Sequence, residues 1–111
     1  MATTYKVLGQ SNPAATTVTT LYTVPASTAT VVSTISVANL AGTAATFRIA
    51  VQKAADVGSI VDKQYIAYDV TVGALDTTTI TVGFTLATAD LIKIYASTAT
   101  LAFNAFGSEI A

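Results

Sequence analysis

The chain alternates apolar and polar residues with a period of two over much of its length. Five segments show this pattern clearly, at residues 31–37, 47–52, 65–72, 79–84 and 91–96. Alternation of β-branched and aromatic residues with polar ones is typical of a strand that is buried on one face. Weaker forms of the same pattern occur at residues 5–8, 17–23 and 101–106. The sequence therefore predicts about eight short strands and no long helix.

Turn-forming residues separate these strands at intervals of roughly ten residues, which is the rhythm of an antiparallel sandwich. The predicted fold is an all-β antiparallel β-sandwich of jelly-roll or immunoglobulin-like order. The chain has no cysteine and no tryptophan, so a true antibody-like domain is disfavoured. The predicted turns lie at residues 12–13, 25–27, 39–42, 73–76, 87–90 and 97–99. The predicted core consists of Val31, Ile35, Val37, Phe47, Ile49, Ile66, Tyr68, Val70, Ile80, Val82, Phe84, Ile92, Ile94 and Phe103.

Length and charge favour a single domain and argue against a nucleic-acid-binding or membrane-spanning protein. A chain of 111 residues is expected to form one domain, residues 1–111, with a core of its own. The net charge of −1 gives no basic field for nucleic acid or for an anionic membrane. Apolar runs are far shorter than the roughly 20 residues that span a bilayer, and the N-terminus shows no secretory signal. Only 10% of residues are charged, which favours a surface that is covered by other subunits over a simple composition bias of the source genome.

Residues for catalysis are scarce. Histidine and cysteine are absent, which removes the usual general base, the usual metal ligands and any thiolate. The six carboxylates are scattered along the chain, and Asp76 and Asp90 precede strands, where they are expected to shape turns. We therefore predict no catalytic residue, no metal site, no cofactor and no enzymatic activity.

Four polar or aromatic residues alternate with the predicted core and should face outward: Arg48, Tyr65, Lys93 and Tyr95. Tyrosine and arginine are enriched at protein interfaces, so these four residues and Tyr5 form a possible partner interface, although they also fit an ordinary solvated surface. The segment around Tyr5 is expected to pair within its own sheet, with addition to a neighbour's sheet as the alternative. Residues 53–62 form the longest connection, which is either a short helical turn or an exposed loop for a partner.

Two stretches of the sequence resemble a module of tailed-bacteriophage structural proteins. The first runs from Leu21-Tyr22-Thr23-Val24-Pro25 to a hydrophobic strand that ends at Asn39. The second covers residues 75–110, including Ala89-Asp90-Leu91-Ile92-Lys93-Ile94-Tyr95 and the closing Asn104-Ala105-Phe106-Gly107. The module often has Ala-Gly where this chain has Ala26-Ser27, which affects only the turn type.

The resemblance implies a virion protein with a β-sandwich fold, assembled in the cytoplasm of a host bacterium. A chain this short is most similar to a capsid decoration, or cement, protein, which implies a homotrimer that bridges subunits of the major capsid protein. A tail, neck, baseplate or fibre accessory subunit is the first alternative. A glycan-binding adhesion module is the second, with Tyr65 and Tyr95 taking the stacking role that tryptophan usually has.

Overall fold

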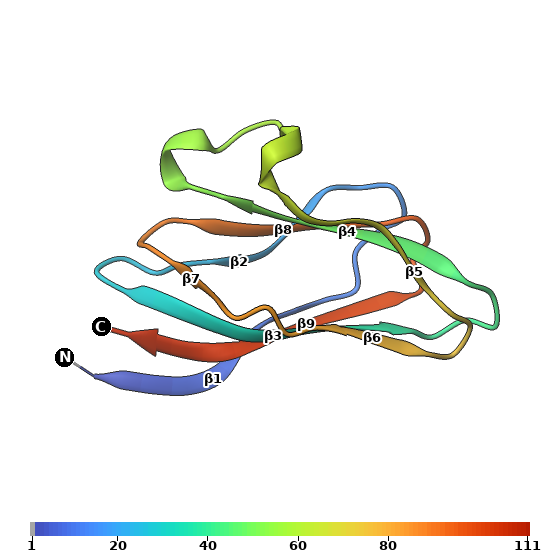
Figure 1. Ribbon diagram of the computed structural model, residues 1–111, viewed down its shortest axis with the longest axis horizontal. Helices are drawn as coiled ribbons and strands as arrows, with labels where there is room; N and C mark the ends of the chain where they lie inside the picture. Colours follow the sequence, from blue (N-terminus) through green and yellow to red (C-terminus); the bar gives the residue numbers. More distant parts are fainter. Residues whose placement is uncertain (1) are drawn as a thin grey trace.

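The computed structural model describes residues 2–111, and its regular elements are nearly all antiparallel strands, which are arranged in two layers (Figure 1). Two single-turn 3₁₀ helices, η1 (Ala54–Asp56) and η2 (Asp62–Gln64), lie in the connection between the fourth and fifth strands. The strands are β1 (Thr3–Ser11), β2 (Thr19–Thr23), β3 (Ala29–Asn39), β4 (Ala45–Gln52), β5 (Tyr65–Val72), β6 (Thr77–Ile80), β7 (Phe84–Leu86), β8 (Leu91–Ala96) and β9 (Leu101–Ile110).

The order of the strands identifies the type of sandwich. The first sheet has the order β1-β9-β3-β6, with β7 also paired to β3, and the second has the order β2-β8-β4-β5. Because β6 and β7 pair with successive parts of β3, they act as one interrupted strand. The first strand then pairs with the last, the second with the last but one, and so on inward. Such a folded-over hairpin is a jelly roll, whereas an immunoglobulin sandwich has its first two strands in one sheet.

The strand predictions are confirmed, with two differences. The closing strand continues to Ile110 rather than ending near residue 106, and β1 likewise extends over Thr3–Ser11. Pairing of β1 with β9 in its own sheet is confirmed. The predicted strand at 79–84 is broken, because residues 81–83 leave the sheet and Gly83 adopts a positive φ of 68°. Connection 53–62 contains the helical turn η1 and the start of η2.

Four predicted core residues are in fact exposed, and each lies beside an irregularity in a strand. Val31 is 36% exposed because an extra residue, Ser33, interrupts the pairing of β3 with β9 and reverses the alternation, so that Val32 is buried instead. Ile66 and Tyr68 are 41% and 56% exposed, and both lie at register shifts between β4 and β5. Val82, at 71%, lies in the break between β6 and β7. Period-two patterns locate strands, but a single bulge changes which face is buried.

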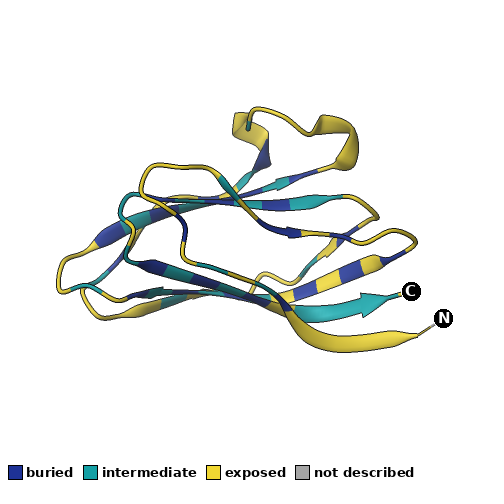
Figure 2. Cartoon of the chain, turned by 180° about the vertical axis from the view of Figure 1, so that it is seen from behind, coloured by how far each residue is buried: buried dark blue, intermediate teal, exposed yellow. Residues whose placement is uncertain are grey.

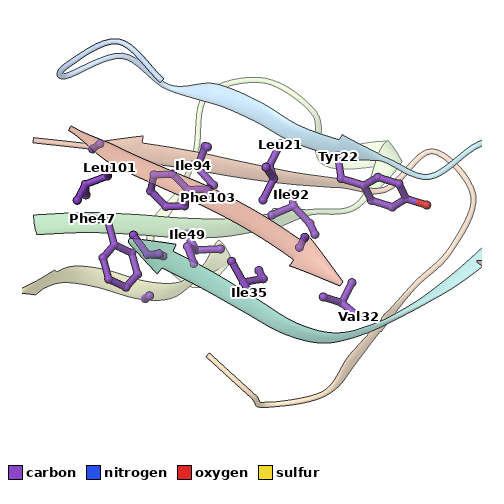
Figure 3. Packing of buried hydrophobic residues seen from close by; sticks show 14 of the residues in the cluster. Leu21, Tyr22, Val32, Ile35, Phe47, Ile49, Ile92, Ile94, Leu101 and Phe103 are labelled. Carbon is purple, nitrogen blue, oxygen red and sulfur yellow. The ribbon is translucent and has the colours of Figure 1, made fainter. Parts of the chain in front are cut away.

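The core fills the space between the two sheets (Figure 3). Phe47 of β4 and Phe103 of β9 meet across it with ring centroids 6.0 Å apart and ring planes at 82°, the edge-to-face geometry that aromatic rings favour. The predicted core residues Ile35, Val37, Ile49, Ile92 and Ile94 are buried, and Val70, Ile80 and Phe84 are partly buried against them. The prediction missed Leu8, Leu21, Tyr22, Val24, Val32, Ala45, Ala67, Val72, Leu86, Ala96, Leu101 and Ala105.

A polar bridge joins the two sheets near the chain termini. The hydroxyl of Tyr22, on β2, donates a hydrogen bond to Glu109 of β9 and lies 2.8 Å from the hydroxyl of Thr30 on β3. Lys6 of β1 donates to the other carboxylate oxygen of Glu109 at 3.2 Å. Tyr22 is only 7% exposed. Its ring therefore belongs to the core while its hydroxyl is held by partners from the opposite sheet.

This bridge predicts a loss of stability in alkaline solution. Burial, and then the hydrogen bond to Glu109, raise the pKa of Tyr22 from 10.0 to about 12. Since the folded pKa lies above the unfolded one, the contribution of Tyr22 is complete below pH 10 and disappears as the pH rises toward 12. We expect the free energy of unfolding of the wild type to fall across this window, relative to Tyr22→Phe, by on the order of 2 kcal/mol.

Tyrosinate absorbance provides the direct measurement. One tyrosine should titrate with a pKa of about 12 in the folded wild type, and this titration should be missing from Tyr22→Phe. If the absorbance change per tyrosine above pH 11 is the same in the wild type and in Tyr22→Phe, the bridge is contradicted.

Candidate interaction surface

The outer face of the first sheet carries no charged residue. Burial and register determine which residues face outward: in β9, Leu101, Phe103 and Ala105 are buried against the second sheet, so the residues between them face away from it. Residues of β1 and β3 that pair directly with these outward residues of β9 also face outward, and so do the residues of β6 and β7 that pair with outward residues of β3. We call this set the uncharged face: Thr3, Tyr5, Val7, Gln10, Ala29, Val31, Thr34, Ser36, Ala38, Thr77, Thr79, Thr85, Ala102, Asn104, Phe106, Ser108 and Ile110.

Exposed apolar side chains gather at one end of the uncharged face. Tyr5 is 84% exposed, Val7 45%, Val31 36% and Phe106 38%. Register places them side by side, because Val7 pairs with Phe106 and both Tyr5 and Val31 pair with Ser108. Contiguous apolar side chains without any charge among them are typical of a surface that another protein covers.

The second sheet has the opposite character. Eight of the eleven charged residues of the chain lie on it or in the connections beside it: Arg48, Lys53, Asp56, Asp62, Lys63, Asp69, Asp90 and Lys93. The connection with η1 and η2 lies over this layer (Figure 1). Gln52 of β4 is fully buried beneath it, and its side-chain amide donates to the carbonyl of Gly58 at 3.2 Å and to the Gln64 side chain at 3.0 Å. The two faces of the sandwich therefore differ sharply in charge.

An arginine packed between two tyrosine rings dominates the exposed part of the second sheet. The Arg48 guanidinium carbon lies 4.2 Å from the ring centroid of Tyr68 and 4.6 Å from that of Tyr95. Its Nε donates to Asp69 at 2.6 Å, and this hydrogen bond holds the pKa of the Asp69 carboxyl below its ordinary value. The Tyr65 ring meets the Tyr68 ring edge-to-face, with centroids 4.8 Å apart. We call Arg48, Tyr65, Tyr68, Asp69 and Tyr95 the arginine–tyrosine cluster.

The predicted interface residues thus divide between two surfaces. Arg48, Tyr65 and Tyr95 come together in the arginine–tyrosine cluster, and Lys93 lies nearby on β8, with its ammonium 3.4 Å from the carbonyl of Gly58. Tyr5 lies on the uncharged face of the other sheet. The prediction missed Tyr68 because it was placed in the core. The side chains of the arginine–tyrosine cluster interact mainly with one another: Asp69 forms an ion pair with Arg48, and the Arg48 guanidinium covers one face of the Tyr95 ring.

Two of the six carboxylates, Asp76 and Asp90, hold backbone N–H groups in place. Asp76 accepts from the backbone N–H of Thr77 at 2.8 Å, and Asp90 accepts from those of Ala87 and Ala54, both at 2.9 Å. These bonds agree with the predicted role of both residues in turns. In the described part of the chain, no three acidic side chains are close enough together to hold a metal ion. No helix formed by residues 2–111 is long and apolar enough to cross a membrane.

Comparison with known proteins gives a match in fold only. No family model and no curated protein sequence matches the chain. Among solved structures, it is similar to a chain in the structure of infectious bursal disease virus, Gx strain, with a TM-score of 0.56 and 11% sequence identity. The match covers 97% of this chain but only 32% of the viral chain. Nearly all of the described sandwich thus has a counterpart in about one third of a protein from a virus structure.

Proposed function

We propose that this chain is a structural subunit of a virus particle, and specifically a capsid decoration protein of a tailed bacteriophage. The uncharged face is the observation that carries the proposal, because a lone soluble protein usually keeps charge on every side. The resemblance to phage structural proteins adds support. It includes β3 and β9, which are the two central strands of the sheet that bears this face.

The size of the uncharged face suits a stable contact. β3 and β9 have 11 and 10 residues, so the face is about 34 Å long, and four strands make it about 19 Å wide. The resulting area of roughly 650 Å² approaches the ~800 Å² that each partner buries in a standard interface. Burying about 300 Å² of apolar area would contribute ~7 kcal/mol before the cost of association.

The proposed mechanism is mechanical and requires no catalysis. Each copy would lay its uncharged face across neighbouring capsid subunits and add contact area that the shell lacks. The charged second sheet would then face solvent and keep the assembled particle soluble. Because the same contact recurs with every copy, a modest gain at each junction would raise the resistance of the whole shell to heat and internal pressure.

Deletion of the gene from the virus that encodes this chain tests the proposal. Particles without the protein should release their genome at a lower temperature, and adding purified protein back should restore their heat resistance. Val31→Asp, which places a charge on the uncharged face, should fail to restore it. Val57→Asp places the same charge at another exposed valine, in the connection over the second sheet, and should restore it.

Three results would count against the proposal. Unchanged heat resistance of particles that lack the protein would remove its mechanical role. Full restoration by Val31→Asp would remove the uncharged face from the contact. Intact shells that lose their tails would instead favour an accessory subunit of the tail.

A further inference from the structure

The free edge of β1 lacks the features that usually prevent an edge strand from pairing with another chain. β1 ends the first sheet, so its side away from β9 pairs with no strand in residues 2–111, and residues Thr3–Val7 are all exposed (Figure 2). Unpaired edges invite another strand, and proteins usually block them with bulges, interruptions or charges. The segment Thr3–Val7 pairs with β9 without any register shift. Its one charge, Lys6, is held by Glu109 at 3.2 Å.

The other three sheet edges are all protected. The pairing of β5 with β4 is shifted on both sides of the pair Ile49–Ala67, and Asp69 of β5 adopts a positive φ of 49° at one of these shifts. β2 is only five residues long and has a shift between Thr20 and Tyr22. The opposite edge of the first sheet is interrupted between β6 and β7. β1 is therefore the edge at which a further strand meets the least resistance.

The hydrogen-bond pattern shows which backbone groups on β1 point to the free side. Ala2 and Ala111 exchange both of their backbone hydrogen bonds, at 2.8 and 2.9 Å. Bonded and non-bonded pairs alternate along an antiparallel ladder, so Thr4 and Lys6 also bond to β9. The N–H and C=O groups of Thr3, Tyr5 and Val7 therefore point away from β9, toward the free edge.

We infer that two copies of this chain pair through β1, antiparallel, with the two-fold axis at Tyr5. In this register Tyr5 lies opposite its own copy, and Thr3 lies opposite Val7. Each of these pairs can exchange two backbone hydrogen bonds, since all the groups involved point outward. Lys6 lies opposite Thr4, so no like charges meet.

The side chains favour the same pairing. Both Tyr5 rings would lie next to each other on the outer side, where cross-strand aromatic pairs contribute to sheet stability. The apolar group of Tyr5, Val7, Val31 and Phe106 would become continuous with that of the second copy. A two-fold contact places the same surface of both copies side by side, so a charged residue near the axis would meet its like-charged copy. The uncharged face has no such residue. The pairing concerns two free copies and does not depend on a virus particle.

Light scattering across a series of protein concentrations tests the pairing. The wild type should approach twice the mass of one chain as concentration rises. Tyr5→Pro removes an outward N–H that no strand uses, so the fold should tolerate it while dimer affinity falls at least ~10-fold. Val82→Lys is the matched control, because Val82 is also highly exposed but lies in the break between β6 and β7, at the opposite side of the first sheet, and it should dimerise like the wild type.

Tyr5→Lys keeps the test decisive if Tyr5→Pro fails to fold. It places two like charges at the axis and should also weaken the dimer at least ~10-fold at low salt, with partial recovery at high salt. A wild type that stays monomeric at every concentration would overturn the pairing. A dimer or trimer that forms equally well in Tyr5→Lys, or that Val82→Lys abolishes, would overturn it as well.

Discussion

Gly107→Ala should cost the protein at least ~3 kcal/mol of its free energy of unfolding. A β-carbon at this position would lie 2.0 Å from the carbonyl oxygen of Val31 and 3.1 Å from the Leu8 side chain. Both neighbouring strands are irregular at this level, with Leu8 inserted in β1 and Ser33 in β3. The backbones crowd around β9 as a result, and an obstacle made of backbone cannot rotate away. Overpacking in such a site typically costs 1–3 kcal/mol, and more when the main chain must move.

Gly42→Ala is the matched control for this substitution. A β-carbon at Gly42 would meet nothing within 4 Å. We expect its stability to remain within about 0.5 kcal/mol of the wild type. Urea denaturation followed by circular dichroism gives both values. If Gly107→Ala unfolds at the same urea concentration as Gly42→Ala, β3 and β9 do not approach each other as closely as described.

Phe103→Ala should destabilise the fold by about 3–5 kcal/mol. Phe103 is fully buried, and its ring packs edge-to-face on Phe47 from the other sheet, so truncation removes a contact between the layers and leaves a cavity. Stabilities of small proteins are about 5–15 kcal/mol, so the variant should be partly unfolded at elevated temperature. Thermal denaturation provides the measurement.

Phe106→Ala, three residues further along the same strand, distinguishes a residue that stabilises the fold from one that contacts a partner. Phe106 faces outward and is 38% exposed, so its loss should change stability by less than about 1 kcal/mol. The same substitution should weaken attachment to particles, because Phe106 belongs to the apolar end of the uncharged face. Equal destabilisation by the two substitutions would show that β9 does not present its residues as the alternation indicates.

The sequence predicts the strands well because period two is a local property. Segments such as 47–52 and 91–96 match β4 and β8 closely, since each is regular and flanked by turns. Faces are harder to predict: Val31, Ile66 and Tyr68 are exposed because bulges shift the alternation within β3 and β5. A bulge depends on the partner strand, and the partner of β3 at its bulge is β9, which is distant in sequence. The pairing of β1 with β9 and the jelly-roll order have the same long-range origin.

The candidate surface shows the same limit. Low charge in the composition indicates a covered surface, but it does not say which one. Only the register reveals that the scattered uncharged positions of five strands share one face, while most charges lie on the other side. The alternation predicts that Arg48, Tyr65 and Tyr95 face outward. The contacts of Arg48 with Tyr68 and Asp69 depend instead on the bulges in β5.

The chain has no cysteine, which allows a direct measurement of the central claim that the uncharged face is the contact with the particle. Thr85→Cys places a single thiol on this face, and Ser59→Cys places one in the exposed connection over the second sheet. Both thiols should react quickly with a maleimide in the free protein. In assembled particles, we predict that Thr85→Cys becomes protected at least ~10-fold while Ser59→Cys reacts as before; a factor of ten corresponds to about 1.4 kcal/mol. Equal reactivity of Thr85→Cys in both states, or protection of Ser59→Cys instead, would contradict the account.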